Sequence, residues 1–371
     1  MGLMDQLTQP PLILPVAKRI PEVAVLHGDR RQDDYFWLRH KDDPEVVAYL
    51  TAENAYADAV MKGTEAFQEA LYQEMLGRIK EDDQTVPYRR GGHFYYSRTE
   101  KGKQYPILCR KAGSLDAPEE VTLDLNVLGE GHAFLALGAY AVSDDGHRLA
   151  YSIDVTGFRE YTLSIKDLRT GDLLPERIEK VAAVAWSADP TVFFYVTEDP
   201  AKRPYRLYRH RSGSATDDLV YEETDELFRL YVSRSRSLAY VFATSGSFTS
   251  TEVRYLPAAL PSAPWTVILP REKDHEYHVD HGGDFFYLRT NGGGLRNFRL
   301  VRVPVGDPRR SGWAELVPHR EDVMLEDVDV FADHYVVQER EDGLARLRVT
   351  GLRDLYSGNN TVNIDRALVL P

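Results

Sequence analysis

Cysteine, basic side chains and long apolar runs are all scarce in this sequence, and each shortage excludes a class of protein. Cys109 is the single cysteine among 371 residues, so the chain cannot form an internal disulfide. The 58 Asp and Glu outnumber the 45 Lys and Arg, and the formal charge of −13 argues against a nucleic acid partner, which requires a basic surface. No stretch approaches the roughly 18 uninterrupted apolar residues of a transmembrane helix, so we expect no membrane partner.

The first residues, 1–5, lack the basic start and the apolar core of a secretory signal. Together with the single cysteine, this predicts a cytoplasmic location. Apolar residues make up 43% of the chain and charged residues 28%, as in soluble globular proteins. The acidic surface would attract cationic peptides or simply keep the protein in solution, and solubility is the simpler interpretation.

A short strand signature, mostly aromatic, returns about every 45 to 55 residues along the chain. Each copy is followed by a second strand in which apolar and polar residues alternate. A period of this length, with room for four short strands, is typical of a β-propeller blade. A series of small β-sandwiches is the alternative, but it would need longer linkers than the sequence contains. The copies lie at residues 94–96, 149–151, 193–195, 238–240, 285–287 and 335–337.

The predicted fold class is therefore all-β, a β-propeller of six four-stranded blades preceded by an N-terminal α-helical arm. The arm covers residues 1–83, the propeller 84–354, and a divergent tail 355–371. The tail ends in the apolar residues 367–370, for which no strand partner is expected. The six blades are predicted at residues 85–126, 139–178, 181–223, 227–270, 277–320 and 324–354.

Two amphipathic helices are predicted in the arm, where apolar residues recur at intervals of three and four. Asp43 is placed to cap the first helix, and Pro44 suits its first position. Gly63 is expected to end this helix, and Thr64 to cap the second one. The apolar stripe of the second helix consists of Phe67, Leu71, Met75 and Ile79.

The densest group of potential metal ligands comprises His275, His278, Asp280 and His281. A zinc peptidase helix needs two histidines four positions apart, and the spacing from His275 to His278 is one residue too short. We interpret these residues as strand and turn residues whose side chains are satisfied by neighbouring backbone. No metal site and no cofactor is predicted.

No serine has a glycine two positions before it, so the nucleophile elbow of a serine hydrolase is missing from this sequence. Residues 212–214 and 245–247, both Ser-Gly-Ser, are interpreted as loop tips. Cys109 lies in an alternating strand, where a thiol usually serves as a small apolar side chain. We therefore predict no catalytic residue. The acidic loops 81–83 and 222–226 would attract cationic peptides, although solvated charge is the simpler interpretation.

A series of motifs resembles the prolyl oligopeptidase family of serine peptidases, and the oligopeptidase B branch more closely than prolyl oligopeptidase itself. The resemblance runs from about residue 16 to about residue 350, with the motifs in the expected order. The motifs are His27-Gly28-Asp29-Arg30, the segments 33–39, 219–223 and 250–254, Lys273-Asp274-His275-Glu276-Tyr277, and Met324-Leu325-Glu326.

The resemblance implies a seven-bladed propeller that lies over an α/β-hydrolase domain and admits only short peptides, which this branch cleaves after Lys or Arg. The arm would pack on that hydrolase domain. This chain has six recognisable blades and no hydrolase segment, so we expect the noncatalytic N-terminal part of such an enzyme, as a truncated product or a fragment, inactive alone and prone to association. A free-standing propeller that acts as a binding or scaffold module is the alternative.

Overall fold

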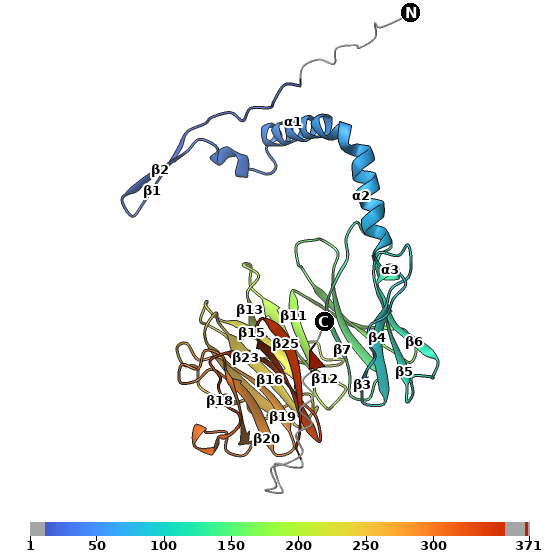
Figure 1. Cartoon of the computed structure of the whole chain (residues 1–371), viewed down its shortest axis with the longest axis vertical. Helices are drawn as coiled ribbons and strands as arrows, with labels where there is room; N and C mark the ends of the chain where they lie inside the picture. The colour runs from blue at the N-terminus through green and yellow to red at the C-terminus, as the bar shows by residue number, and fades with distance from the viewer. Residues whose placement is uncertain (1–11, 353–367, 370–371) are drawn as a thin grey trace, which may run out of the picture. The chain divides into compact units, whose positions relative to one another are not determined.

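The computed structural model describes residues 12–352 and 368–369 (Figure 1). The chain divides into two units, and the boundary along the sequence lies between Glu81 and Asp82. The first unit contains the arm, and the second contains the sheets. Because their relative position is not determined, each unit is described by itself.

The arm begins with a hairpin of β1 (Glu22–Leu26) and β2 (Asp29–Asp33). Its two-residue turn contains His27 and Gly28, both at positive φ, which matches the right-handed twist of a tight hairpin. The short 3-10 helix η1 (Phe36–Arg39) follows the hairpin.

A continuous helical segment of 34 residues completes the arm. It consists of α1 (Pro44–Met61), the 3-10 turn η2 (Lys62–Thr64) and α2 (Glu65–Gly77). The predicted cap is confirmed, because the Asp43 side chain accepts a hydrogen bond from the Glu45 backbone N–H. The α-helix α1 ends at Met61, close to the expected stop at Gly63, but the stop is incomplete because the helical backbone continues through a tighter 3-10 turn. Thr64 does not cap α2, since its hydroxyl donates to the carbonyl of Met61.

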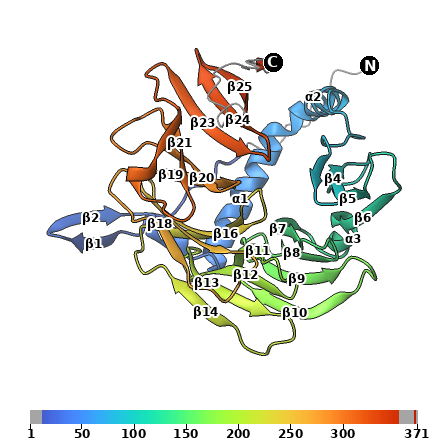
Figure 2. The ribbon, with the colours of Figure 1, turned by 90° about the horizontal axis from the view of Figure 1, so that it is seen from below.

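Six four-stranded antiparallel sheets form the second unit and confirm the predicted propeller fold. Within each sheet the strands follow chain order, and the sheets succeed one another around an arc (Figure 2). Blades 1 to 3 contain β3 (Tyr88–Arg90), β4 (His93–Arg98), β5 (Ile107–Ala112), β6 (Glu119–Asp124); β7 (Ala136–Val142), β8 (Arg148–Asp154), β9 (Thr162–Asp167), β10 (Leu173–Glu179); and β11 (Val181–Trp186), β12 (Val192–Glu198), β13 (Pro204–Arg211), β14 (Asp218–Glu222).

Blades 4 to 6 contain β15 (Arg229–Arg234), β16 (Tyr240–Gly246), β17 (Thr251–Pro257), β18 (Thr266–Leu269); β19 (Tyr277–Gly282), β20 (Phe285–Thr290), β21 (Arg299–Pro304), β22 (Ala314–Val317); and β23 (Val323–Val330), β24 (His334–Glu341), β25 (Leu344–Gly351), β26 (Leu368–Val369). Two short helices, α3 (Leu125–Gly129) and η3 (Arg310–Gly312), lie in the connections.

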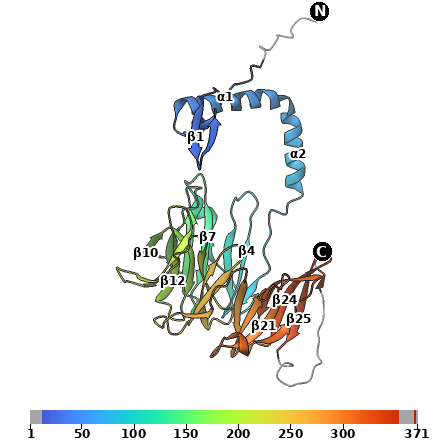
Figure 3. The same ribbon diagram turned by 90° about the vertical axis from the view of Figure 1, so that its left-hand side faces the viewer.

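Consecutive blades lie side by side (Figure 3). Five apolar clusters lie between the six sheets. Each of these clusters draws side chains from two consecutive blades. Between blades 2 and 3, for example, Ile165 packs with Trp186 and Phe193, all at most 1% exposed. The other face of blade 1 carries only a small cluster of Tyr96, Ile107 and Cys109. Burial of apolar side chains between sheets is therefore what holds consecutive blades together.

The tail differs from its prediction at one point. Leu368 and Val369 pair with Leu347 and Arg346 of β25, and so they complete the sixth blade as its fourth strand. The expectation that residues 367–370 have no strand partner is wrong for these two. The remaining tail residues lie outside the described part of the chain.

Candidate functional site

The first strands of all six blades surround a central cavity of about 820 Å³, which we call the central channel. Its lining is rich in charge. The cationic side chains come from blades 1 and 4, and the anionic ones from blades 5 and 6. The charged lining residues are Arg89, Arg90, Arg234, Arg236, Asp280, Asp327 and Asp329.

This lining suits a flexible, charged ligand such as a peptide better than an apolar small molecule, because small-molecule pockets are lined mainly by apolar groups. Within the described part of the chain, none of the residues that line the channel is a histidine or a cysteine. A serine–histidine pair does lie at its edge, where the Ser237 hydroxyl and Nδ1 of His281 are 2.7 Å apart. His281 is 6% exposed and packs against Tyr240 and Phe286, and within the described residues no hydrogen bond is recorded between it and a carboxylate. The pair therefore lacks the third member that orients a catalytic histidine.

The predicted histidine group is spread over several contacts. His275 is 3% exposed, with Nε2 2.8 Å from the Thr290 hydroxyl and Nδ1 3.0 Å from Arg310. The interpretation that neighbouring backbone satisfies these histidines is therefore wrong for His275, whose partners are a hydroxyl and an arginine. It holds in part for His281, which interacts with the Gly283 backbone as well as with Ser237. His278 is exposed, and the Asp280 carboxylate accepts a hydrogen bond from the Arg236 backbone N–H. Within the described residues, no three His, Cys, Asp or Glu side chains lie close enough together to hold a metal ion.

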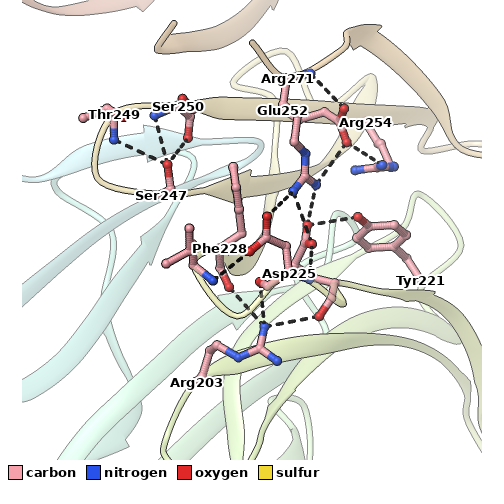
Figure 4. Close-up of polar contacts among 12 residues, drawn as sticks. Arg203, Tyr221, Asp225, Phe228, Ser247, Thr249, Ser250, Glu252, Arg254 and Arg271 are labelled. Atoms are coloured by element: carbon pink, nitrogen blue, oxygen red, sulfur yellow. Dashed lines mark hydrogen bonds and ion pairs between the residues drawn. The ribbon is translucent and has the colours of Figure 1, made fainter. Parts of the chain in front are cut away.

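The acidic loop 222–226 contains a buried ionic network that joins blades 3 and 4 (Figure 4). Glu223 is 2% exposed, and its carboxylate accepts hydrogen bonds from Arg271 at 2.6 and 3.3 Å. The same guanidinium approaches Glu252, which is 7% exposed and also pairs with Arg254. Arg203 donates to the backbone carbonyls of Glu223 and Asp225 in the loop and to that of Phe228 just after it.

Electrostatics keeps this network ionised. Burial alone would raise the pKa of Glu223, but the hydrogen bonds it accepts, foremost from Arg271, outweigh burial and lower the pKa to about 2. The adjacent Glu222 pairs with Arg206 at 2.9 Å nearer the surface. The interpretation of this loop as an attractor of cationic peptides, or as solvated charge, is therefore wrong for Glu223. This network could not be predicted from a local sequence pattern, because Glu223 and Arg271 lie 48 positions apart.

Ser245 and Cys109, the two potential nucleophiles considered above, are both buried in strands. Ser245 is a fully buried residue of β16, so the interpretation of residues 245–247 as a loop tip is wrong at that position, whereas residues 212–214 do lie in a turn. Cys109 is 1% exposed, and burial raises the pKa of its thiol to about 11, which keeps it protonated near neutral pH.

Among the described residues, no helix combines the length and the apolar character needed to cross a membrane. The N-terminal beta-propeller domain of prolyl oligopeptidase matches residues 15–367. The chain therefore belongs to the prolyl oligopeptidase family.

Curated relatives and solved structures agree with this assignment. Dipeptidyl aminopeptidase BI of Pseudoxanthomonas mexicana is 41% identical over 90% of this chain and 49% of its own length. Protease 2 of Moraxella lacunata is 38% identical over 91% of this chain and 50% of its own length. Oligopeptidase B from Leishmania major superposes with a TM-score of 0.83 at 29% identity, over 92% of this chain and 51% of that one. The chain thus spans about half the length of the relatives it matches.

Proposed function

We propose that this chain is the N-terminal gating propeller of an oligopeptidase B-like serine peptidase. The observation that carries the proposal is the central channel of about 820 Å³, whose charged wall lies inside a propeller of this family. A passage of this kind would limit entry to short, unfolded peptides and exclude folded proteins.

The complete enzyme is proposed to cleave short peptides after Lys or Arg. The formal charge of −13 would draw cationic peptides toward the chain, and Asp280, Asp327 and Asp329 would bind them along one wall of the channel, while four arginines line the parts that come from blades 1 and 4. The names of the relatives support peptidase chemistry, since they include Protease 2 and oligopeptidase B. A hydrolase domain that packs on the arm and the propeller would supply the nucleophile, and the location would be cytoplasmic.

The chain alone is proposed to be inactive, because the described lining of the channel contains no histidine or cysteine. The test is to incubate the purified chain with a short chromogenic peptide that ends in Arg, and no turnover is expected. The DNA downstream of the codon for Pro371 supplies the second test. A reading frame with a Gly-x-Ser-x-Gly hydrolase would support the peptidase, whereas its absence would favour the free-standing binding module. Turnover by the purified chain would overturn the proposed inactivity.

A further inference from the structure

The turn that joins β15 to β16 in blade 4 contacts several blades that are not its neighbours. We name residues 234–238 the β15–β16 turn. We propose that this turn closes one mouth of the central channel and determines the size and charge of what passes, an inference that rests on the gating role proposed above. Three sets of contacts support it.

Arg234 holds the turn toward blades 2 and 3. Its guanidinium donates to Asp144 of blade 2 at 2.8 Å and to the backbone carbonyl of Trp186 in blade 3. A further hydrogen bond returns to the carbonyl of Leu238 within the turn. The Arg234 side chain is only 6% exposed, so this ion pair is shielded from solvent and forms the firm anchor of the turn.

Arg236 and Ser237 hold the turn toward blades 5 and 6. The Arg236 backbone N–H donates to Asp280 of blade 5 at 3.0 Å, and its guanidinium pairs with Asp329 of blade 6 and lies 4.6 Å from the Phe331 ring. The Ser237 hydroxyl contacts His281 of blade 5. One short turn is thus tied to blades on both sides of it.

Leu238 lines a cavity together with residues of blade 1. Its φ of 61° lies in the left-handed region that a leucine rarely adopts, so tertiary contacts must hold it there. Leu238 lines the central channel and also a second cavity of about 140 Å³, whose other walls are the first turns of blades 1 and 2 at residues 90–93 and 143–146. The side chain therefore lies where the inner edges of blades 1, 2 and 4 converge, which is the position of a plug.

The two anchors differ in strength, and this difference allows the turn to move. Arg236 and Asp329 are 45% and 51% exposed, and an ion pair so accessible to solvent contributes little stability. A Lys or Arg of an incoming peptide would compete with the Arg236 guanidinium for Asp329. Entry of a cationic peptide would then release the outer anchor while Arg234 stays bound. The turn thereby discriminates in favour of cationic peptides.

The test uses a cysteine reporter inside the channel of the whole chain. Val184 lines the channel and is partly buried, and Val184→Cys in a Cys109→Ala background places the single thiol on the channel wall. The labelling rate is measured with a bulky polyethylene glycol maleimide and with small N-ethylmaleimide. For Arg236→Gln, we expect labelling by the bulky reagent to accelerate about tenfold, the order that loss of a weak ion pair and its ring contact allows, with little change for the small one.

Asp329→Asn removes the same ion pair from blade 6 and should reproduce this effect. The matched control is Arg211→Gln, because Arg211 pairs with Asp189 within blade 3 at a comparable exposure, 58% and 38%. High salt should accelerate bulky labelling of the parent but not of Arg236→Gln. Circular dichroism of each variant confirms that it is folded.

Equal rates in the parent and in both variants would overturn the role of the turn, as would an equal acceleration by the control. The readout needs no peptidase activity, so its failure can be told apart from a failure of the gating proposal. A complete enzyme that digests large and small substrates alike would defeat the gating role while leaving the labelling result intact.

Discussion

Two adjacent glutamates show how position alone decides what a carboxylate contributes. Glu222 ends β14 and pairs with Arg206 near the surface, with side chains 34% and 39% exposed. Glu223 turns inward to Arg271, and its side chain is 3% exposed. An exposed pair of this kind contributes less than about 1 kcal/mol, whereas removing one partner of a buried pair leaves an uncompensated charge.

We therefore expect Glu223→Gln to lower the free energy of unfolding by about 2 to 4 kcal/mol, and Glu222→Gln by less than about 1 kcal/mol. Urea denaturation of both variants at pH 7 measures the difference. Similar losses in the two variants would show that Arg271 finds another partner.

The pH dependence has a definite sign. The pKa of Glu223 lies at about 2 in the folded chain, below its ordinary value of 4.5, so the folded state binds this proton less readily than the unfolded state. Its contribution, at most about 3 kcal/mol, is present above pH 4.5 and is lost as the pH falls toward 2. Glu223→Gln should flatten the loss of stability in that window relative to Glu222→Gln.

Cys109 provides a second prediction at this scale. Because its thiol is buried and its pKa is raised to about 11, we expect almost no reaction with a thiol reagent at pH 8 in the folded chain and rapid reaction in urea. The reaction rate, followed by absorbance against urea concentration, reports the opening of blade 1. Fast reaction without urea would mean that this face of blade 1 opens readily.

At the scale of the element, the sequence predicted what depends on near neighbours. Alternation places strand residues within a few positions of one another, so the blades were located closely, and the cap at Asp43 depends on residues two positions apart. Leu368–Val369 is too short to carry a pattern, and its partner strand lies well before it in the chain. Leu238 was included in a strand signature, but it lies in the turn before Tyr240.

The same reason limits what could be foreseen of the site. The period of the strand signature predicted a propeller, a fold whose blades surround a central channel. The pairs that shape the passage join Arg234 to Asp144 and Arg236 to Asp329, which lie 90 and 93 positions apart. No local spacing marks such pairs, so they emerge only when the blades are placed around the channel.

Gly63 gives a test of the helical arm. Its φ is not positive and a Cβ at this position would have no heavy atom within 4 Å, so alanine fits without strain. We expect Gly63→Ala to strengthen the helix across residues 62–64 by about 1 kcal/mol, since glycine is a poor helix former. Amide hydrogen exchange at residues 62–70 should slow several-fold. Thr64→Ala also introduces a better helix former but loses the hydrogen bonds of the hydroxyl with Met61 and Gln68, so it should slow exchange less than Gly63→Ala.

Across the whole molecule, apolar burial is unevenly distributed. The sheets have apolar clusters between each consecutive pair, whereas the described part of the arm buries only Val46 in α1 and no residue of α2. The predicted stripe of α2 therefore remains exposed, with Phe67 at 69% and Met75 at 53%. Exposed apolar rows of this kind mark association surfaces.

We accordingly expect the purified chain to self-associate as its concentration rises. Phe67→Ser combined with Met75→Ser should shift sedimentation toward the monomer while leaving the thermal midpoint of the sheets nearly unchanged, because both side chains are exposed. Gln68→Ser, on a neighbouring position of the same helix, is the control and should associate like the parent. A parent chain that stays monomeric at every concentration would contradict this expectation and would mean that some other surface covers the stripe in solution.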